Sequence, residues 1–127
     1  MRSYGKPGTD RGQMSYPYDV KVDGEGRQFV CEFGNSRIQI FDRNNQPLEI
    51  LGGPGAAPGQ FSNPWGVALD SKGNLYVADA MNHRVQKFIR RESAAADARR
   101  RTDRAFDDPA SNQHGHVLTS VATAGRK

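Results

Sequence analysis

One segment of this chain occurs twice, at a fixed offset of 47 residues. Residues 5–42 align with residues 52–89 without a gap, and 15 of the 38 aligned pairs are identical. Unrelated sequences would share only a few identities over this length. A period of roughly 20–50 residues is typical of repeat architectures, in which one supersecondary unit is stacked or arrayed. The sequence therefore predicts two copies of one structural unit.

Each copy consists of short segments with a two-residue alternation, separated by Gly, Pro, Asn and Asp. In the second copy, Val67 and Leu69 fall on one face of such a segment, as in a half-buried strand. Residues 71–74 then supply turn chemistry, and the next segment is rich in strand-forming residues. The expected strands are 18–23, 28–33, 37–42 and 47–51 in the first copy, and 65–70, 75–79 and 84–89 in the second.

Antiparallel strands joined by connections too short for helices indicate an all-β fold made of four-stranded propeller blades. The blades are expected to span residues 1–89, with repeats at about 5–51 and 52–89. The second copy shows no fourth strand of its own. Residues 2–4, in turn, resemble the end of a fourth strand from a blade outside this chain. This register is that of a ring closed by an N-terminal strand.

Residues 90–127 contain no third copy of the pattern. They carry 8 Lys or Arg and 5 Asp or Glu, so this tail supplies most of the formal net charge of +4. Residues 90–106 are rich in Ala and Arg, which favours a solvated helix, and residues 117–121 are weakly strand-like. Because few apolar residues are available for burial, we expect a mostly disordered, partly helical tail.

The chain has a single cysteine, Cys31, which excludes an intramolecular disulfide framework. The second copy has Ala78 at this position, so Cys31 is expected to be a small core residue. The first residues lack the apolar stretch of a signal peptide, and no apolar run approaches the ~20 residues that span a bilayer. The default expectation is a cytoplasmic protein without a membrane segment.

Three stretches of the second copy form a longer motif: PWGVALD at residues 64–70, GNLYVAD at 73–79 and NHRVQKF at 82–88. Together they resemble the NHL repeat. The first copy matches with Tyr18-Asp19 for the usual Gly-Val and with Glu32 for the usual Asp. The resemblance covers about residues 5–89 and implies four-stranded blades, six of which normally close one propeller.

The resemblance implies a binding or scaffold domain for proteins, peptides or RNA, although some relatives are peptide-amidating lyases or lactone hydrolases. We therefore expect a non-catalytic module that binds a protein or peptide. A fragment of such a propeller enzyme is the alternative, and RNA binding through the arginine-bearing tail is a weaker one. Since two blades cannot close a six-bladed ring, a homotrimer that completes it is a further hypothesis.

An acidic residue, an asparagine and an arginine recur at the same positions of both copies. We interpret Glu32 and Asp79 as braces for the following Asn-x-Arg turn through charge-assisted hydrogen bonds, because a catalytic residue need occur only once. Asp23 and Asp70 are expected to serve tight turns. The predicted structural motif comprises Asp23, Glu32, Asn35 and Arg37 in the first copy and Asp70, Asp79, Asn82 and Arg84 in the second.

Tyr16, Tyr18 and Trp65 lie at the start of the first strand of each blade. In a propeller this end can face a central funnel, where rigid aromatic side chains suit contact with a ligand. Packing between adjacent blades is the competing and more frequent use of such residues. The three aromatic residues are the candidate ligand-binding residues.

No constellation in the sequence predicts catalysis, a cofactor or a metal site. His83 stands where the first copy has Ser36, and His114 and His116 lack the convergent set of ligands that zinc needs. The tail arginines are interleaved with acidic residues and have no aromatic platform for bases, which argues against nucleic acid. Neither a Gly-rich phosphate loop nor a nucleophile elbow is present. The sequence therefore predicts a protein that is not an enzyme.

Overall fold

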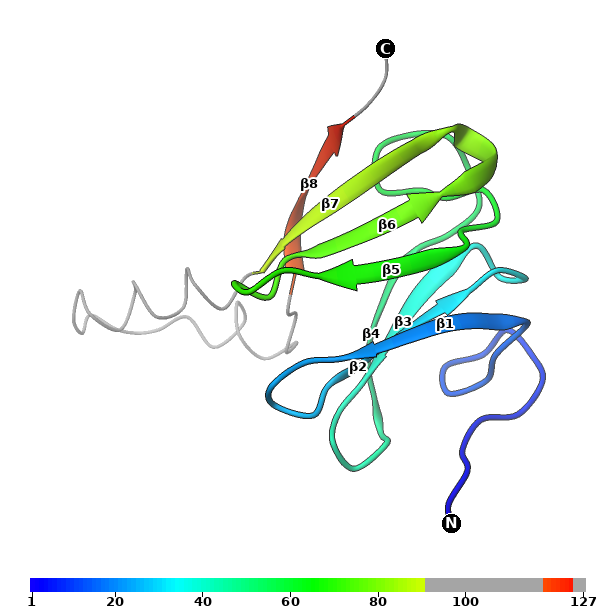
Figure 1. The fold of residues 1–127 in the computed structure, drawn as a ribbon. Helices are drawn as coiled ribbons and strands as arrows, with labels where there is room; N and C mark the ends of the chain where they lie inside the picture. Colours follow the sequence, from blue (N-terminus) through cyan, green and yellow to red (C-terminus); the bar gives the residue numbers. More distant parts are fainter. Residues whose placement is uncertain (91–117, 125–127) are drawn as a thin grey trace, which may run out of the picture.

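The computed structural model describes residues 1–90 and 118–124, and its architecture is all-β (Figure 1). Two four-stranded antiparallel sheets follow each other, in the orders β1-β2-β3-β4 and β5-β6-β7-β8. The first sheet contains β1 (Pro17–Val22), β2 (Gln28–Glu32), β3 (Arg37–Phe41) and β4 (Pro47–Gly52). The second contains β5 (Gly66–Leu69), β6 (Leu75–Asp79), β7 (Arg84–Arg90) and β8 (Leu118–Ala124).

The seven strands expected from the sequence are confirmed to within one residue at each end. Their alternation also places the apolar residues as expected. Val67 pairs with Val77 and Leu69 with Leu75, and paired residues of neighbouring strands share a face. Val67 is only 6% exposed, and the other three are buried or half-buried. The predicted half-buried strand is thus confirmed.

The strand β8 was not assigned to the second repeat, although residues 117–121 are weakly strand-like in sequence. The sequence showed no fourth strand in the second repeat, but β8 pairs antiparallel with β7, with Phe88 opposite Val121. The prediction was wrong because it relied on the spacing of 47 residues, and a long stretch of chain separates β7 from β8. Residues 90–127 were expected to be mostly disordered and partly helical. Residues 118–124 instead form β8, and residues 91–117 and 125–127 lie outside the described residues.

Residues 2–4 form no strand in the structure. Instead of pairing as the end of a fourth strand, this segment places the ring of Tyr4 edge-on against Phe41, with centroids 5.2 Å apart. The next residues make a β-bridge between Pro7 and Met14, and the second copy repeats this bridge between Pro54 and Phe61. The N-terminal segment is therefore the first repeat's counterpart of the connection between the two sheets.

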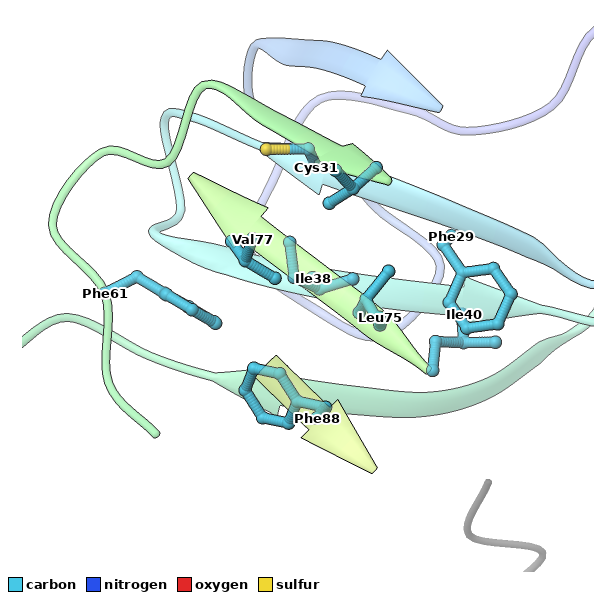
Figure 2. Close-up of a cluster of buried hydrophobic side chains, with 9 residues drawn as sticks. Phe29, Cys31, Ile38, Ile40, Phe61, Leu75, Val77 and Phe88 are labelled. Carbon is cyan, nitrogen blue, oxygen red and sulfur yellow. The ribbon is translucent and has the colours of Figure 1, made fainter. Parts of the chain in front are cut away.

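The two sheets bury one continuous apolar core between them (Figure 2). Its members come from β2, β3, β5, β6, β7 and the connection before β5, and no member is more than 6% exposed. They are Phe29, Cys31, Ile38, Ile40, Phe61, Val67, Leu75, Val77 and Phe88. Burying side chains of this size contributes roughly 1.5–3 kcal/mol each, so each repeat depends on the other for its core.

Cys31 lies fully buried in this core, as the sequence predicted. Burial, followed by the nearby carboxylates of Asp19 and Glu32, raises the pKa of the Cys31 thiol to about 12. The thiolate is the reactive form of cysteine, and it is absent at neutral pH under these conditions. The interpretation of Cys31 as a small core residue is confirmed.

Candidate functional site

A buried carboxylate lies at the end of β2 in the first repeat. Glu32 is fully buried, and its Oε1 atom accepts a hydrogen bond from Asn35 Nδ2 at 2.7 Å. Its Oε2 atom accepts hydrogen bonds from Arg37 Nε and Gln39 Nε2, both at 2.9 Å. The guanidinium of Arg37 then donates to the backbone carbonyls of Thr9 and Gln13, at 2.7 and 2.8 Å. The network ties the N-terminal loop to the sheet.

The second repeat contains the same network at the end of β6. Asp79 Oδ2 accepts hydrogen bonds from Asn82 Nδ2 at 3.0 Å, Arg84 Nε at 2.8 Å and Gln86 Nε2 at 3.1 Å. Arg84 donates in turn to the carbonyls of Ala57 and Gln60. The glutamines of the two networks were absent from the predicted motif, although Gln39 and Gln86 are identical at the repeat offset. That identity was the available signal.

These two networks define what the buried carboxylates can do chemically. The remaining oxygen of Asp79, Oδ1, accepts a hydrogen bond from the backbone N–H of Ser62 at 2.7 Å. Glu32 Oε1 likewise accepts from the backbone N–H of Ser15 at 3.3 Å. Both carboxylates are fully buried and engaged through both oxygens. They hold loops in place and present no acid or base to solvent.

Asp23 and Asp70 lie in the turns that follow β1 and β5. Asp23 Oδ1 accepts hydrogen bonds from the backbone N–H groups of Glu25 and Arg27, both at 2.9 Å. Asp70 Oδ1 accepts from those of Lys72 and Asn74, also at 2.9 Å. Hydrogen bonding, chiefly from the Asn74 backbone N–H, lowers the pKa of Asp70 to about 2. The ionised carboxylates therefore hold the turns closed.

Two of the three candidate aromatic residues are in contact. The rings of Tyr18 and Trp65 meet edge to face with centroids 6.4 Å apart, and Tyr18 also stacks on Phe33 at 4.5 Å. Tyr16, Tyr18 and Trp65 are 68%, 52% and 61% exposed. Within the described residues, Tyr16 makes no ring contact with the other two. We call Tyr16, Tyr18, Phe33 and Trp65 the aromatic patch. Phe33, which directly follows the neighbouring strand β2, was not predicted from the sequence.

A direct hydrogen bond joins the two repeats beside this patch. Asp19 Oδ2 on β1 accepts from the backbone N–H of Val67 on β5, at 3.0 Å. Lys21 Nζ lies 3.0 Å from the other oxygen, Asp19 Oδ1. The hydrogen bonds and the lysine charge together lower the pKa of Asp19 against the opposing effect of burial. The start of β1 and the start of β5 are thus held together by an ionised carboxylate.

The side chain of His83 belongs to neither network, although the residue stands between Asn82 and Arg84. His83 follows the short 3-10 helix η1 (Ala80–Asn82), is exposed and has a left-handed backbone with φ of 55°. His114 and His116 lie outside the described residues. Among residues 1–90 and 118–124, no group of three or more His, Cys, Asp or Glu is placed to hold a metal ion. In those same ranges, no helix has the length and apolar character needed to cross a membrane.

Comparisons with known proteins agree with this geometry. The NHL repeat family matches residues 61–88, which run from the end of the connecting loop to β7. The chain is 41% identical to protein lin-41 of Caenorhabditis elegans over 42 residues, which make up 33% of this chain and 4% of that protein. It is 39% identical to NHL repeat-containing protein 3 of Homo sapiens over 41 residues, or 32% of this chain and 12% of that protein.

The chain therefore spans a small part of the length of the curated relatives that it matches. The family match lies in the second repeat, and the first repeat has the same strand order, carboxylate network and bridged loop. Residues 61–88 are thus similar to an NHL repeat, and both β-sheets have the four-stranded antiparallel form of a propeller-like blade.

Proposed function

We propose that this chain is a non-catalytic interaction module that binds a protein or peptide through its aromatic patch. The observation that carries the proposal is the exposure of Tyr18 and Trp65, which stay 52% and 61% exposed while their rings touch. Tyrosine and tryptophan are enriched among the residues that dominate binding energy at protein interfaces. The exposure also separates these side chains from the apolar core between the two blades.

Contacts within the chain hold the patch in place, which favours binding. Tyr18 is stacked on Phe33, and the backbone N–H of Trp65 donates to the carbonyl of Ala78 at 3.0 Å. Asp19 holds the two strands together beside the rings. A surface that is ordered before binding loses less conformational entropy when a partner arrives. Residues of both repeats build the patch, so a partner would contact both at once.

The family resemblance supports the same function, because NHL repeats imply binding or scaffold domains. The carboxylates that recur in both copies support it as well. Glu32 and Asp79 are committed to loops through both oxygens, so their recurrence serves the fold.

The test is a peptide-display selection on the full chain, followed by titration of the selected peptides. We expect Tyr18→Ala and Trp65→Ala each to weaken binding by about tenfold or more, the usual effect of removing a dominant aromatic contact. Val85→Ala is the control, because Val85 is also exposed, at 43%, but lies on β7, outside the aromatic patch. Selected peptides that bind the alanine variants as tightly as the original chain would contradict the proposal, as would a failure to select any.

A further inference from the structure

The two repeats present the same four positions in opposite states. Where the first sheet meets the second, these positions belong to, or border, the apolar core; they are Leu51 on β4, Phe61 in the connection, and Val67 and Leu69 on β5. The residues that stand 47 positions earlier are Tyr4, Met14, Val20 and Val22. We call each set of four the receiving positions of its repeat.

Three of the four receiving positions of the first repeat lie open, and the fourth, Met14, is half-buried. Tyr4, Val20 and Val22 are 39%, 49% and 61% exposed. Tyr4, Met14 and Val20 line an open hollow of about 430 Å³ on this side of the sheet. Val20 pairs with Val30, just as Val67 pairs with Val77 in the second sheet, so the two sets of positions lie on equivalent faces. The first sheet therefore has an apolar face of the kind that the second sheet buries.

The opposite face of the first sheet shows what covers such positions. It presents four side chains that are at most 1% exposed, and these pack against the second sheet (Figure 2). They are Phe29, Cys31, Ile38 and Ile40, which we call the covering positions of the first repeat. In the second repeat the corresponding residues are Tyr76, Ala78, Val85 and Lys87.

The covering positions of the second repeat differ in chemistry. The Tyr76 hydroxyl donates a hydrogen bond to Asp70 at 3.0 Å, and the Lys87 ammonium lies 5.5 Å from the centroid of the Tyr76 ring. Lys87 stands where the first repeat buries Ile40. Because burying an unpaired charge is costly, this face is a poor cover for another blade. A polar outer face is typical of the terminal unit in a repeat array.

Charges at the edge of the interface between the two sheets also argue against a second copy of this chain on the open face. Arg90 Nη2 lies 3.1 Å from Glu25 Oε2, which joins the end of β7 to the first turn of the other sheet. The equivalents of this pair are Arg43 and Lys72. A second copy docked head to tail would therefore place Lys72 near Arg43, and like charges would meet. A homotrimer, in which three chains of two blades complete a ring of six, would contain this unfavourable contact three times.

We propose that the open face of β1 in the first sheet receives a β-sheet of a partner protein, not a second copy of this chain. That sheet has the chemistry of the chain's own first sheet: apolar side chains at the four covering positions and a carboxylate beside Arg43. Arg43 is exposed and has no ion-pair partner among the described residues, whereas the equivalent Arg90 pairs with Glu25. The docking surface is Tyr4, Met14, Val20, Val22 and Arg43. It adjoins the aromatic patch, because Tyr18 of that patch lines the same hollow as Tyr4, Met14 and Val20.

The chain itself provides a probe. In a donor variant, the second sheet receives the side chains of the first through Lys72→Glu, Tyr76→Phe, Val85→Ile and Lys87→Ile. The same variant carries Val20→Asp, which blocks its own open face and prevents chain growth. The full-length donor is titrated into the wild-type chain, and complex mass is measured by sedimentation velocity. We expect a 1:1 complex, formed at least about tenfold more tightly than any association of the wild type with itself.

Variants of the acceptor, the chain into which the donor is titrated, test whether the proposed residues form the interface. Val20→Asp in the acceptor should abolish the complex, and Arg43→Glu should weaken it by several-fold. Circular dichroism checks that the donor is folded; if it is not, the donor with Lys72→Glu, Lys87→Ile and Val20→Asp alone is used for the same titration. A folded donor that does not bind, or a complex indifferent to Val20→Asp, would overturn the proposal. So would a wild-type trimer that Val20→Asp dissociates, because a second copy would then be the occupant. None of these outcomes depends on peptide binding at the aromatic patch.

Discussion

β1 and β5 are the same strand of the repeat in two different environments. Val20 on β1 is 49% exposed, whereas Val67, its equivalent on β5, is 6% exposed. Both strands start from similar sequences and pair in the same way with the next strand. The difference lies in the neighbour, because the first sheet covers β5 and nothing in the described structure covers β1. A blade of this kind supplies strands, and the adjacent blade completes its core.

Among the tests that compare the two repeats, the largest expected loss of stability comes from removing the buried carboxylate of each repeat. Glu32→Ala leaves Arg37, which is 8% exposed, without its counter-ion, and we expect a loss of about 3–5 kcal/mol in the free energy of unfolding. Asp79→Ala should cost less, because the side chain of Arg84 is more exposed, at 14%, than that of Arg37, at 9%. Urea unfolding measures both losses. A larger loss for Asp79→Ala would contradict the idea that burial sets the cost.

The second test replaces the equivalent valines. Val67→Ala should lower the free energy of unfolding by about 2 kcal/mol, since it removes buried methyl groups and leaves a cavity. Val20→Ala should change it by less than about 0.5 kcal/mol, as exposed substitutions do. The measurement is chemical denaturation of the two variants side by side. Equal losses would mean that β1 is covered in solution, and mass measurement would then reveal by what.

The third test uses pH to probe the turn after β5. The pKa of Asp70 is lowered from 3.8 to about 2 in the folded chain, so its ionised form stabilises the fold. Because the folded pKa is depressed, this contribution is fully present above pH 3.8 and is lost as the pH falls through about 2. Unfolding of wild type and Asp70→Asn between pH 5 and pH 2 should show a smaller acid-induced loss in the variant. Parallel pH profiles for the two proteins would contradict this assignment.

The smallest expected effect concerns the rim ion pair. Glu25→Gln removes the ion pairs with Arg90 and Arg27, and we expect a loss of only about 0.2–1 kcal/mol because the Glu25 side chain is 56% exposed. The loss should shrink in high salt, which screens exposed charges. Lys72→Gln, at the equivalent position of the other repeat, is the control and should leave stability unchanged or slightly raised. Thermal unfolding at two salt concentrations measures the difference, and a salt-independent loss would argue against an ion pair.

The strands and turns were predictable because their signals are local. The period-two alternation placed seven strands within one residue of their observed ends, and Asp23 and Asp70 close turns through bonds to residues two and four positions away. The buried networks were only partly predictable. Spacing along one chain segment indicated Glu32, Asn35 and Arg37. Gln39, two residues beyond Arg37 on β3, was missed, although its identity with Gln86 at the repeat offset was an available signal.

The sequence by itself determined the repeat, the all-β class, the strand ends and the recurring carboxylate motif, because each of these follows from residue type and spacing within one unit. The tertiary structure decided the rest. It paired the distant strand β8 with β7, brought Phe33 to Tyr18, and buried Val67 while leaving Val20 exposed. Whether a side chain is buried depends on what lies opposite it. The equivalent strands β1 and β5 therefore differ in exposure, because only β5 is covered by another sheet.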